Sequence, residues 1–315
     1  MAMTATTQLG DNTWVVSYAM GATVSDVSTA VTAVLTGAEW TVHDAAAGTN
    51  AICYRASNID ASTYKYMVLD YNTSGWLFVK TYEAWNETTH AGTNVCPNGA
   101  DTTKGYQQAL NLTTDKGLIY CFANARYAAF IIRQYSSAVL GNTVTCGISG
   151  VFEFSRDNPD DTVVAGYPVH CFLNTGIAGE NAVNTNETIS IPRTKSGAAG
   201  VQQYGEISTV FGKTLYTTPW LLKDMIPNAV SLWSSKDWAI SLYAQDGTPT
   251  TPSVRGRIQG LKAFTQTRLN FMDRIQVPCD ASLNYDPTGT LVDHFVIPGG
   301  KQGSGIYTFR FLIPA

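Results

Sequence analysis

Apolar positions near the start of the chain recur at the spacing of an α-helix. They lie three and four residues apart between residues 27 and 34, which places them on one side of a helix. Ser25 can cap this helix, and Gly37 follows as a natural stop. The Thr/Ala-rich segment before Ser25 shows no such pattern. We therefore expect it to be weakly structured and to act as an arm over a neighbouring subunit.

Beyond this helix, almost every hydrophobic pattern predicts a β-strand. Residues 64–71 and 75–82 are rich in β-branched and aromatic residues, and the turn residues 72–74 join them. This combination predicts a β-hairpin. The next residues, from about 86 to 116, are polar and have no regular period, so we expect an irregular stretch there.

Two further regions carry clear strand patterns. Residues 117–122 and 127–134, separated by a break at Asn124, predict a second hairpin. Residues 150–154 alternate between apolar and polar positions, which predicts a half-buried strand. Shorter apolar or alternating runs predict more strands at residues 51–55, 239–244, 253–265, 274–278, 293–298 and 306–313.

These elements predict a mostly β protein of the α+β type. We expect an antiparallel β-sandwich or barrel-like sheets with one N-terminal helix packed on a sheet. Residues 178–200 are small, polar and rich in Asn and Gly, as in a domain boundary or a long surface loop. The division is then an N-terminal helix plus β domain at 1–177 and a second β region at 201–315, which can belong to the same compact domain.

Composition adds one unusual feature, a scarcity of charge. Charged residues make up 14% of the chain, against roughly 25% in typical soluble proteins. Protein interfaces are depleted in Lys and Glu and enriched in aromatic residues, so this composition fits a subunit that loses surface to its neighbours. It fits many secreted β proteins as well. The net charge of −4 and the scattered basic residues argue against direct nucleic-acid contact.

The sequence has neither a secretory signal pattern at its start nor an apolar run of about 18 residues. We therefore expect a protein synthesised in a host cytoplasm, with no membrane span. Its six cysteines are far apart, so they form no CxxC pair for zinc or redox chemistry. Several lie in apolar runs, which predicts that most are small buried residues, with disulfide formation after release as the alternative.

The catalytic and phosphate-binding sequence motifs that we searched for are absent or lack a required residue. The segment 211–214 ends like a phosphate-binding loop, but Ile207 stands where that loop requires glycine. There is no GxSxG or HExxH motif, and the four histidines are isolated in the sequence. Glycoside hydrolysis requires two carboxylates that the fold brings together. The sequence does not show which two of the candidates would form such a pair; the candidates are Asp70, Glu83, Glu153 and Asp157. We therefore predict no catalytic residue, no cofactor and no metal site.

Aromatic side chains on and beside the first predicted hairpin are the remaining candidates for a functional surface. Trp76, Tyr82 and Trp85 stand out among them. Flat rings of this kind can stack on sugars. The alternative is that half of the hairpin's rings point into the core and the rest lie in a subunit contact.

Five short segments, together with the general texture of the chain, resemble virion proteins of tailed bacteriophages. The segments are residues 40–44, 64–71, 82–86, 150–159 and 256–262. The resemblance implies a place in the virion, in the tail, baseplate, neck or collar, and assembly into rings with other virion proteins. It carries over no functional residue. We therefore expect a non-enzymatic structural subunit that forms a symmetric oligomer, with a receptor-binding or glycan-degrading tail component as the alternative.

Overall fold

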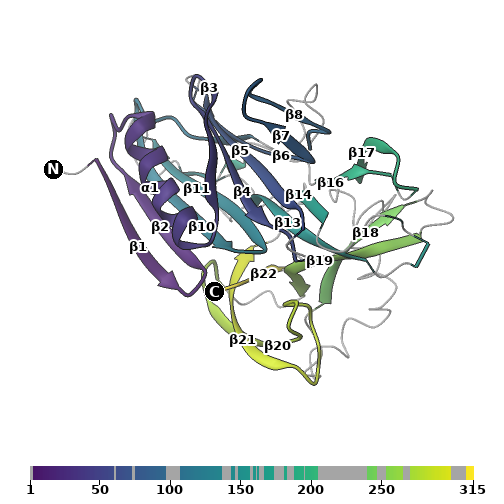
Figure 1. The fold of residues 1–315 in the computed structure, drawn as a ribbon. Coiled ribbons are helices and arrows are strands. Elements are labelled where there is room, and N and C mark those ends of the chain that lie inside the picture. Colours follow the sequence, from purple (N-terminus) through teal and green to yellow (C-terminus); the bar gives the residue numbers. More distant parts are fainter. Residues whose placement is uncertain are drawn as a thin grey trace.

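The computed structural model shows a mostly β protein with antiparallel sheets and one N-terminal α-helix among the residues it describes, which confirms the predicted fold class (Figure 1). The described residues are 3–59, 62–72, 75–96, 107–136, 143–145, 148–156, 159–160, 162, 167–173, 181–182, 188–194, 196–204, 240–246, 253–264, 270–298 and 310–315.

The larger sheet follows one main path of nine strands with six further strands beside it. In spatial order the path is β1 (Thr4–Gly10), β2 (Thr13–Tyr18), β10 (Asp115–Asn124), β11 (Tyr127–Ser136), β13 (Ile148–Arg156), β19 (Ser253–Phe264), β22 (Arg310–Pro314), β21 (Thr290–Pro298) and β20 (Arg274–Cys279). The strands beside it are β12 (Thr143–Thr145), β14 (Tyr167–Leu173), β15 (Asn181–Ala182), β16 (Thr188–Arg193), β17 (Ala199–Tyr204) and β18 (Ile240–Asp246).

This sheet curls so that its C-terminal strands approach the β1–β2 turn, while the rest of β1 stays at the margin of the molecule (Figure 1). The backbone N–H of Asn12 donates to the carbonyl oxygen of Ala315 at 3.1 Å, and its side-chain amide donates to the same oxygen at 3.0 Å. At the far end of the path, Arg274 donates to the Leu9 carbonyl at 2.7 Å. These bonds hold the end of β22 and the start of β20 against the β1–β2 turn.

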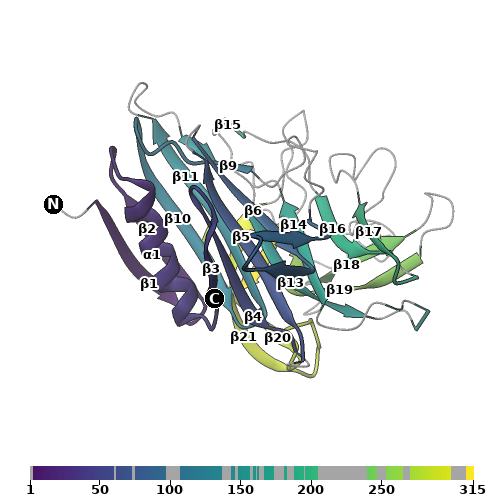
Figure 2. The ribbon, with the colours of Figure 1, turned by 45° about the horizontal axis from the view of Figure 1, so that its top comes forward.

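The second sheet has five strands and lies against the first. Its order is β3 (Thr41–Gly48), β4 (Ala51–Ser57), β5 (Tyr64–Asn72), β6 (Trp76–Tyr82) and β9 (Gln107–Ala109) (Figure 2). A separate small hairpin is formed by β7 (Ala84–Asn86) and β8 (Ala91–Thr93) (Figure 1). The β5–β6 and β10–β11 pairs confirm both predicted hairpins. The expectation that 86–116 is irregular is wrong in part, because the short strands β8 and β9 and the start of β10 lie within it, whereas the turn at 87–90 and residues 110–114 fit it.

The helix α1 (Val24–Gly37) begins one residue before the position that we expected to cap it. Thr23 is the N-cap: its hydroxyl accepts from the Asp26 N–H at 3.1 Å, and the Asp26 carboxylate accepts from the Thr23 N–H at 2.8 Å. This reciprocal capping box satisfies two backbone donors. Ser25, the expected cap, is an exposed residue inside the helix.

Among the described residues, no helix is long and apolar enough to cross a membrane.

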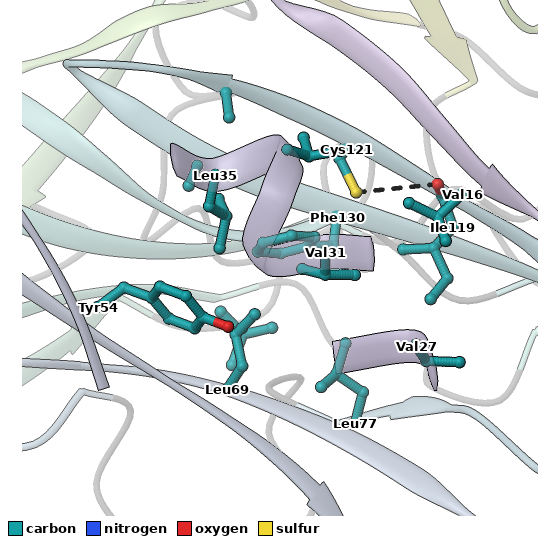
Figure 3. Close-up of a cluster of buried hydrophobic side chains, with 14 of the residues drawn as sticks. Val16, Val27, Val31, Leu35, Tyr54, Leu69, Leu77, Ile119, Cys121 and Phe130 are labelled. Atoms are coloured by element: carbon teal, nitrogen blue, oxygen red, sulfur yellow. Dashed lines mark hydrogen bonds between the residues drawn. The ribbon is translucent and has the colours of Figure 1, made fainter. Parts of the chain in front are cut away.

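The helix packs into a core shared with both sheets (Figure 3). Its buried face carries Val27, Val31 and Leu35. The five-stranded sheet contributes Tyr54, Leu69 and Leu77, and the larger sheet contributes Val16, Ile119, Cys121 and Phe130.

The described cysteines are all buried free thiols, as predicted; they are Cys53, Cys96, Cys121, Cys171 and Cys279. Cys146 lies outside the described residues.

Two expectations about structure and exposure are wrong. The segment before Ser25 is not weakly structured, because β1 and β2 pair with each other and β2 pairs with β10. The strand at 150–154 is not half-buried: all five residues are buried. The reason is that β13 lies in the middle of the large sheet with a core on each face. Val151 packs in the core shared with the helix, whereas Phe152 and Phe154 pack in a second core on the opposite face.

The predicted boundary at 178–200 contains strands. Both β15 and β16, together with the first residues of β17, fall within it. On either side of it, β13 pairs with β14 and also with β19, so strands from both predicted regions join one sheet. The division into 1–177 and 201–315 remains a prediction.

Candidate functional site

An open pocket of about 690 Å³ lies where the β7–β8 hairpin covers the outer face of the five-stranded sheet. The sheet floor is contributed by β4, β5 and β6, and one side is formed by the small hairpin. The polar and aromatic side chains that line the pocket include Asn50, Asp70, Lys80, Tyr82, Trp85 and His90. Its volume is within the range of about 300–1,000 Å³ that is usual for ligand pockets.

The strand period decides which side chains reach this face. In β6, Leu77, Val79 and Thr81 are buried towards the core, so Lys80 and Tyr82 point to the outer face. In β5, Asp70 pairs with Phe78 of β6, and its side chain reaches the outer face as well. The Asp70 carboxylate and the Lys80 ammonium are 4.0 Å apart and about a third and a quarter exposed, at 35% and 24%.

A buried carboxylate, Asp44, fixes the hairpin onto the sheet. One of its oxygens accepts from the Trp85 indole N–H at 2.9 Å and lies 2.8 Å from Nδ1 of His90. The other accepts from the Ala46 N–H at 2.8 Å. Burial alone would raise the pKa of Asp44, but these hydrogen bonds together lower it below its ordinary value. The side chain is therefore ionised at neutral pH, and its carboxylate orients both rings.

The two aromatic rings of the pocket pack edge to face. The Tyr82 and Trp85 ring centroids are 5.0 Å apart with an interplanar angle of 75°. Both rings rest on a small apolar cluster formed by Ala51, Cys53 and Val68. Gly92 is required beneath them, because a Cβ there would lie 2.2 Å from the Tyr82 ring and 2.8 Å from the Trp85 ring.

Of the three aromatic residues predicted from the sequence, the structure brings two together. Tyr82 and Trp85 line the pocket, whereas Trp76 does not. Trp76 lies on the same face of β6 but at its other end, opposite Asn72 and Ala109. Sequence reasoning missed Asp44 and His90, whose partnership depends on a register shift in β3 between Val42 and Asp44.

The carboxylates considered for glycoside hydrolysis do not form a facing pair among the described residues. Glu153 is buried and bound to Lys65 at 2.5 Å. Glu83 accepts from Arg193 and Asn94. Asp70 lies beside Lys80 in the pocket, and Asp157 lies outside the described residues.

Two of the four histidines are sealed in the interior. Nε2 of His170 lies 3.3 Å from the Ser149 hydroxyl, but both residues are fully buried. Nε2 of His294 lies 2.8 Å from Nζ of Lys262 and is equally buried. Burial lowers the pKa of each histidine to about 3. A substrate has no access to either pair, so these contacts are structural.

His43 and His90 lie near the surface and each contacts a carboxylate. His43 is 2.8 Å from Glu87 and stacks at a tilt against Tyr66, whereas His90 binds Asp44. Within the described ranges, no three His, Cys, Asp or Glu side chains gather closely enough to hold a metal ion.

No protein-family model matches the chain, and no curated protein matches it significantly.

Proposed function

We propose that the chain is a non-enzymatic structural subunit of a phage particle that pairs with a copy of itself through the open edge of β1. The observation that carries this proposal is the character of that edge. β1 is the first strand of the large sheet, and among the described residues no strand pairs with its outer side. Both figures place it at the outermost margin of the molecule (Figures 1 and 2).

The hydrogen-bond register tells which backbone groups are available. The Ala19 N–H donates to the Met3 carbonyl at 2.9 Å, and Thr4 pairs with Tyr18. In an antiparallel pair the inward and outward groups alternate. The N–H and C=O groups of Thr4, Thr6 and Gln8 therefore point away from β2, towards solvent.

From Thr4 to Gln8 the edge lacks the features that usually prevent strands from pairing. Natural edges carry charges, proline or bulges. The seven residues of β1 include no charge and no proline, and its register shift falls only at the Gln8–Gly10 end. By contrast, the opposite edge strand β20 carries Arg274 and Pro278. The contrast supports β1 as the edge that accepts a partner.

A second copy of β1 fits this edge. If two copies pair antiparallel about a two-fold axis at Thr6, then Thr6 meets Thr6 of the partner subunit and Thr4 meets Gln8 of the partner subunit. Each such pair would exchange two backbone hydrogen bonds. No like charges face one another, and cross-strand threonine pairs are favourable. A two-fold contact of this kind is the commonest way in which identical chains associate.

Placement in a virion rests on the sequence resemblance and on the scarcity of charge. Pairs joined at β1 would be the units from which a ring is built, and other virion proteins would bind the remaining surfaces. The absence of enzymatic activity is part of the proposal. It is supported by the described candidate carboxylates, each of which lies against a basic group.

Replacing Thr6 by proline tests the proposed contact. Proline removes an N–H that points away from β2, so the sheet within the subunit loses no hydrogen bond while the pairing edge does. We expect Thr6→Pro to weaken self-association by roughly tenfold or more. Sedimentation velocity of the full chain over a range of concentrations measures this, because the subunit mass is 34.0 kDa and a pair has twice that mass.

Thr6→Val is the matched control, because it keeps the backbone donor and a β-branched side chain, and it is expected to associate as the wild type does. A wild-type chain that stays at the subunit mass at every concentration would refute pairing. So would a Thr6→Pro variant that associates as strongly as the wild type.

A further inference from the structure

We infer that the pocket between the β7–β8 hairpin and the five-stranded sheet binds a neutral saccharide. This inference goes beyond the proposed assembly function, because the pocket lies on the five-stranded sheet and β1 is an edge of the other sheet. A particle subunit with such a site would also contact a glycan.

The charges in the pocket favour a neutral ligand. The Asp70 carboxylate and the Lys80 ammonium are 4.0 Å apart on the pocket floor. Their opposite charges largely cancel for a ligand that spans both, so neither an anion nor a cation is strongly attracted. Together they offer acceptors and donors side by side, which suits neighbouring hydroxyl groups on one sugar ring.

The aromatic side of the pocket is held in place before any ligand binds. The Trp85 indole is fixed by its hydrogen bond to Asp44 and by its edge-to-face contact with Tyr82. A ring that is already oriented loses little conformational freedom on binding. Aromatic rings beside polar groups match the two kinds of surface that a sugar presents, its apolar C–H face and its hydroxyls.

Shape and composition argue against a flat protein contact at this position. The cores of protein interfaces are depleted in charged residues, whereas this pocket is lined by Asp70 and Lys80 as well as by Asn50 and His90. A volume of about 690 Å³ admits a small oligosaccharide. The polar lining is poorly suited to an apolar ligand of the same size.

Binding is tested with the full chain and a panel of neutral tetrasaccharides built from glucose, galactose, mannose or N-acetylglucosamine, together with an anionic heparin tetrasaccharide. Saturation-transfer NMR detects contact, and calorimetry gives the dissociation constant. We expect at least one neutral tetrasaccharide to bind and the anionic one to bind more weakly.

Two variants locate the site and a third controls for general effects. Asp70→Ala removes a partly exposed acceptor and Tyr82→Leu removes a ring, and each is expected to weaken binding by roughly tenfold or more. Trp76→Leu changes a ring on the same face of β6 outside the pocket, and binding should be unchanged. Thermal unfolding of each variant confirms that it is folded.

Two results would overturn the inference: no contact with any neutral tetrasaccharide, or binding that Asp70→Ala and Tyr82→Leu leave unchanged. Preference for the anionic probe would also overturn it. Self-association of the same samples, followed by sedimentation, reports on the proposed assembly function separately, so the two can fail independently.

Discussion

Lys65→Met is expected to lower the free energy of unfolding by about 3–5 kcal/mol, because it leaves a buried carboxylate without its counter-charge. The Lys65 ammonium lies 2.5 Å from the Glu153 carboxylate, and both side chains are almost wholly inaccessible, at 0% and 1%. Lys65 belongs to β5 and Glu153 to β13. The pair therefore joins the two sheets through the interior, and chemical denaturation of the purified variant measures the loss.

The double variant Lys65→Met/Glu153→Leu separates the charge effect from packing. Replacing both partners by apolar residues of similar size removes the unpaired charge, so we expect most of the stability to return. Lys80→Met is the matched control in the same sheet, since the Lys80–Asp70 pair is partly exposed and longer. Its expected effect is below about 1 kcal/mol. Equal losses for Lys65→Met and Lys80→Met would contradict this description of the interior.

Trp40→Ala is expected to destabilise the fold by about 3–5 kcal/mol. Trp40 lies three residues after the end of α1, is fully buried, and packs in the core that the helix shares with both sheets. Its indole N–H donates to the Asn124 carbonyl at 2.8 Å, at the turn between β10 and β11. One side chain thus fixes the end of the helix to the larger sheet, and its removal leaves a large cavity.

Trp40→Phe tests the hydrogen bond apart from the packing. The smaller ring still fills much of the space, while the Asn124 carbonyl loses its donor, so a loss of about 1–3 kcal/mol is expected. Leu291→Ala serves as the surface control because Leu291 is 59% exposed. If Trp40→Ala were no more harmful than Leu291→Ala in denaturant unfolding, the placement of Trp40 in the core would be wrong.

Local signals in the sequence were sufficient for the two hairpins. The β5–β6 pair has aromatic and β-branched strands on either side of turn residues, and the β10–β11 pair turns at Asn124. Such signals depend on neighbours in the chain. The first hairpin, β1–β2, escaped notice because the exposed Thr/Ala residues of β1 lack any alternation between apolar and polar positions.

Features that depend on distant contacts were not predictable in this way. The strand around Gly150 has a core on each face because elements far away in the sequence cover both sides of the sheet. The cap at Thr23 was missed although its signal was local, an Asp three residues further on. At the pocket, the rings of Tyr82 and Trp85 were predictable as candidates. Their anchor Asp44 is about forty residues away and is aligned by an irregular register in β3.

Hydrogen exchange at β1 tests the central claim, pairing of the chain with a copy of itself, most directly. The amides of Thr4, Thr6 and Gln8 point away from β2, whereas those of Ala5 and Thr7 point towards it and serve as an internal reference. We predict that the three outward amides exchange rapidly in dilute solution and become protected as the concentration rises, while Ala5 and Thr7 are protected throughout. Rapid exchange of all three outward amides at every concentration, with Ala5 and Thr7 still protected, would contradict pairing through this edge.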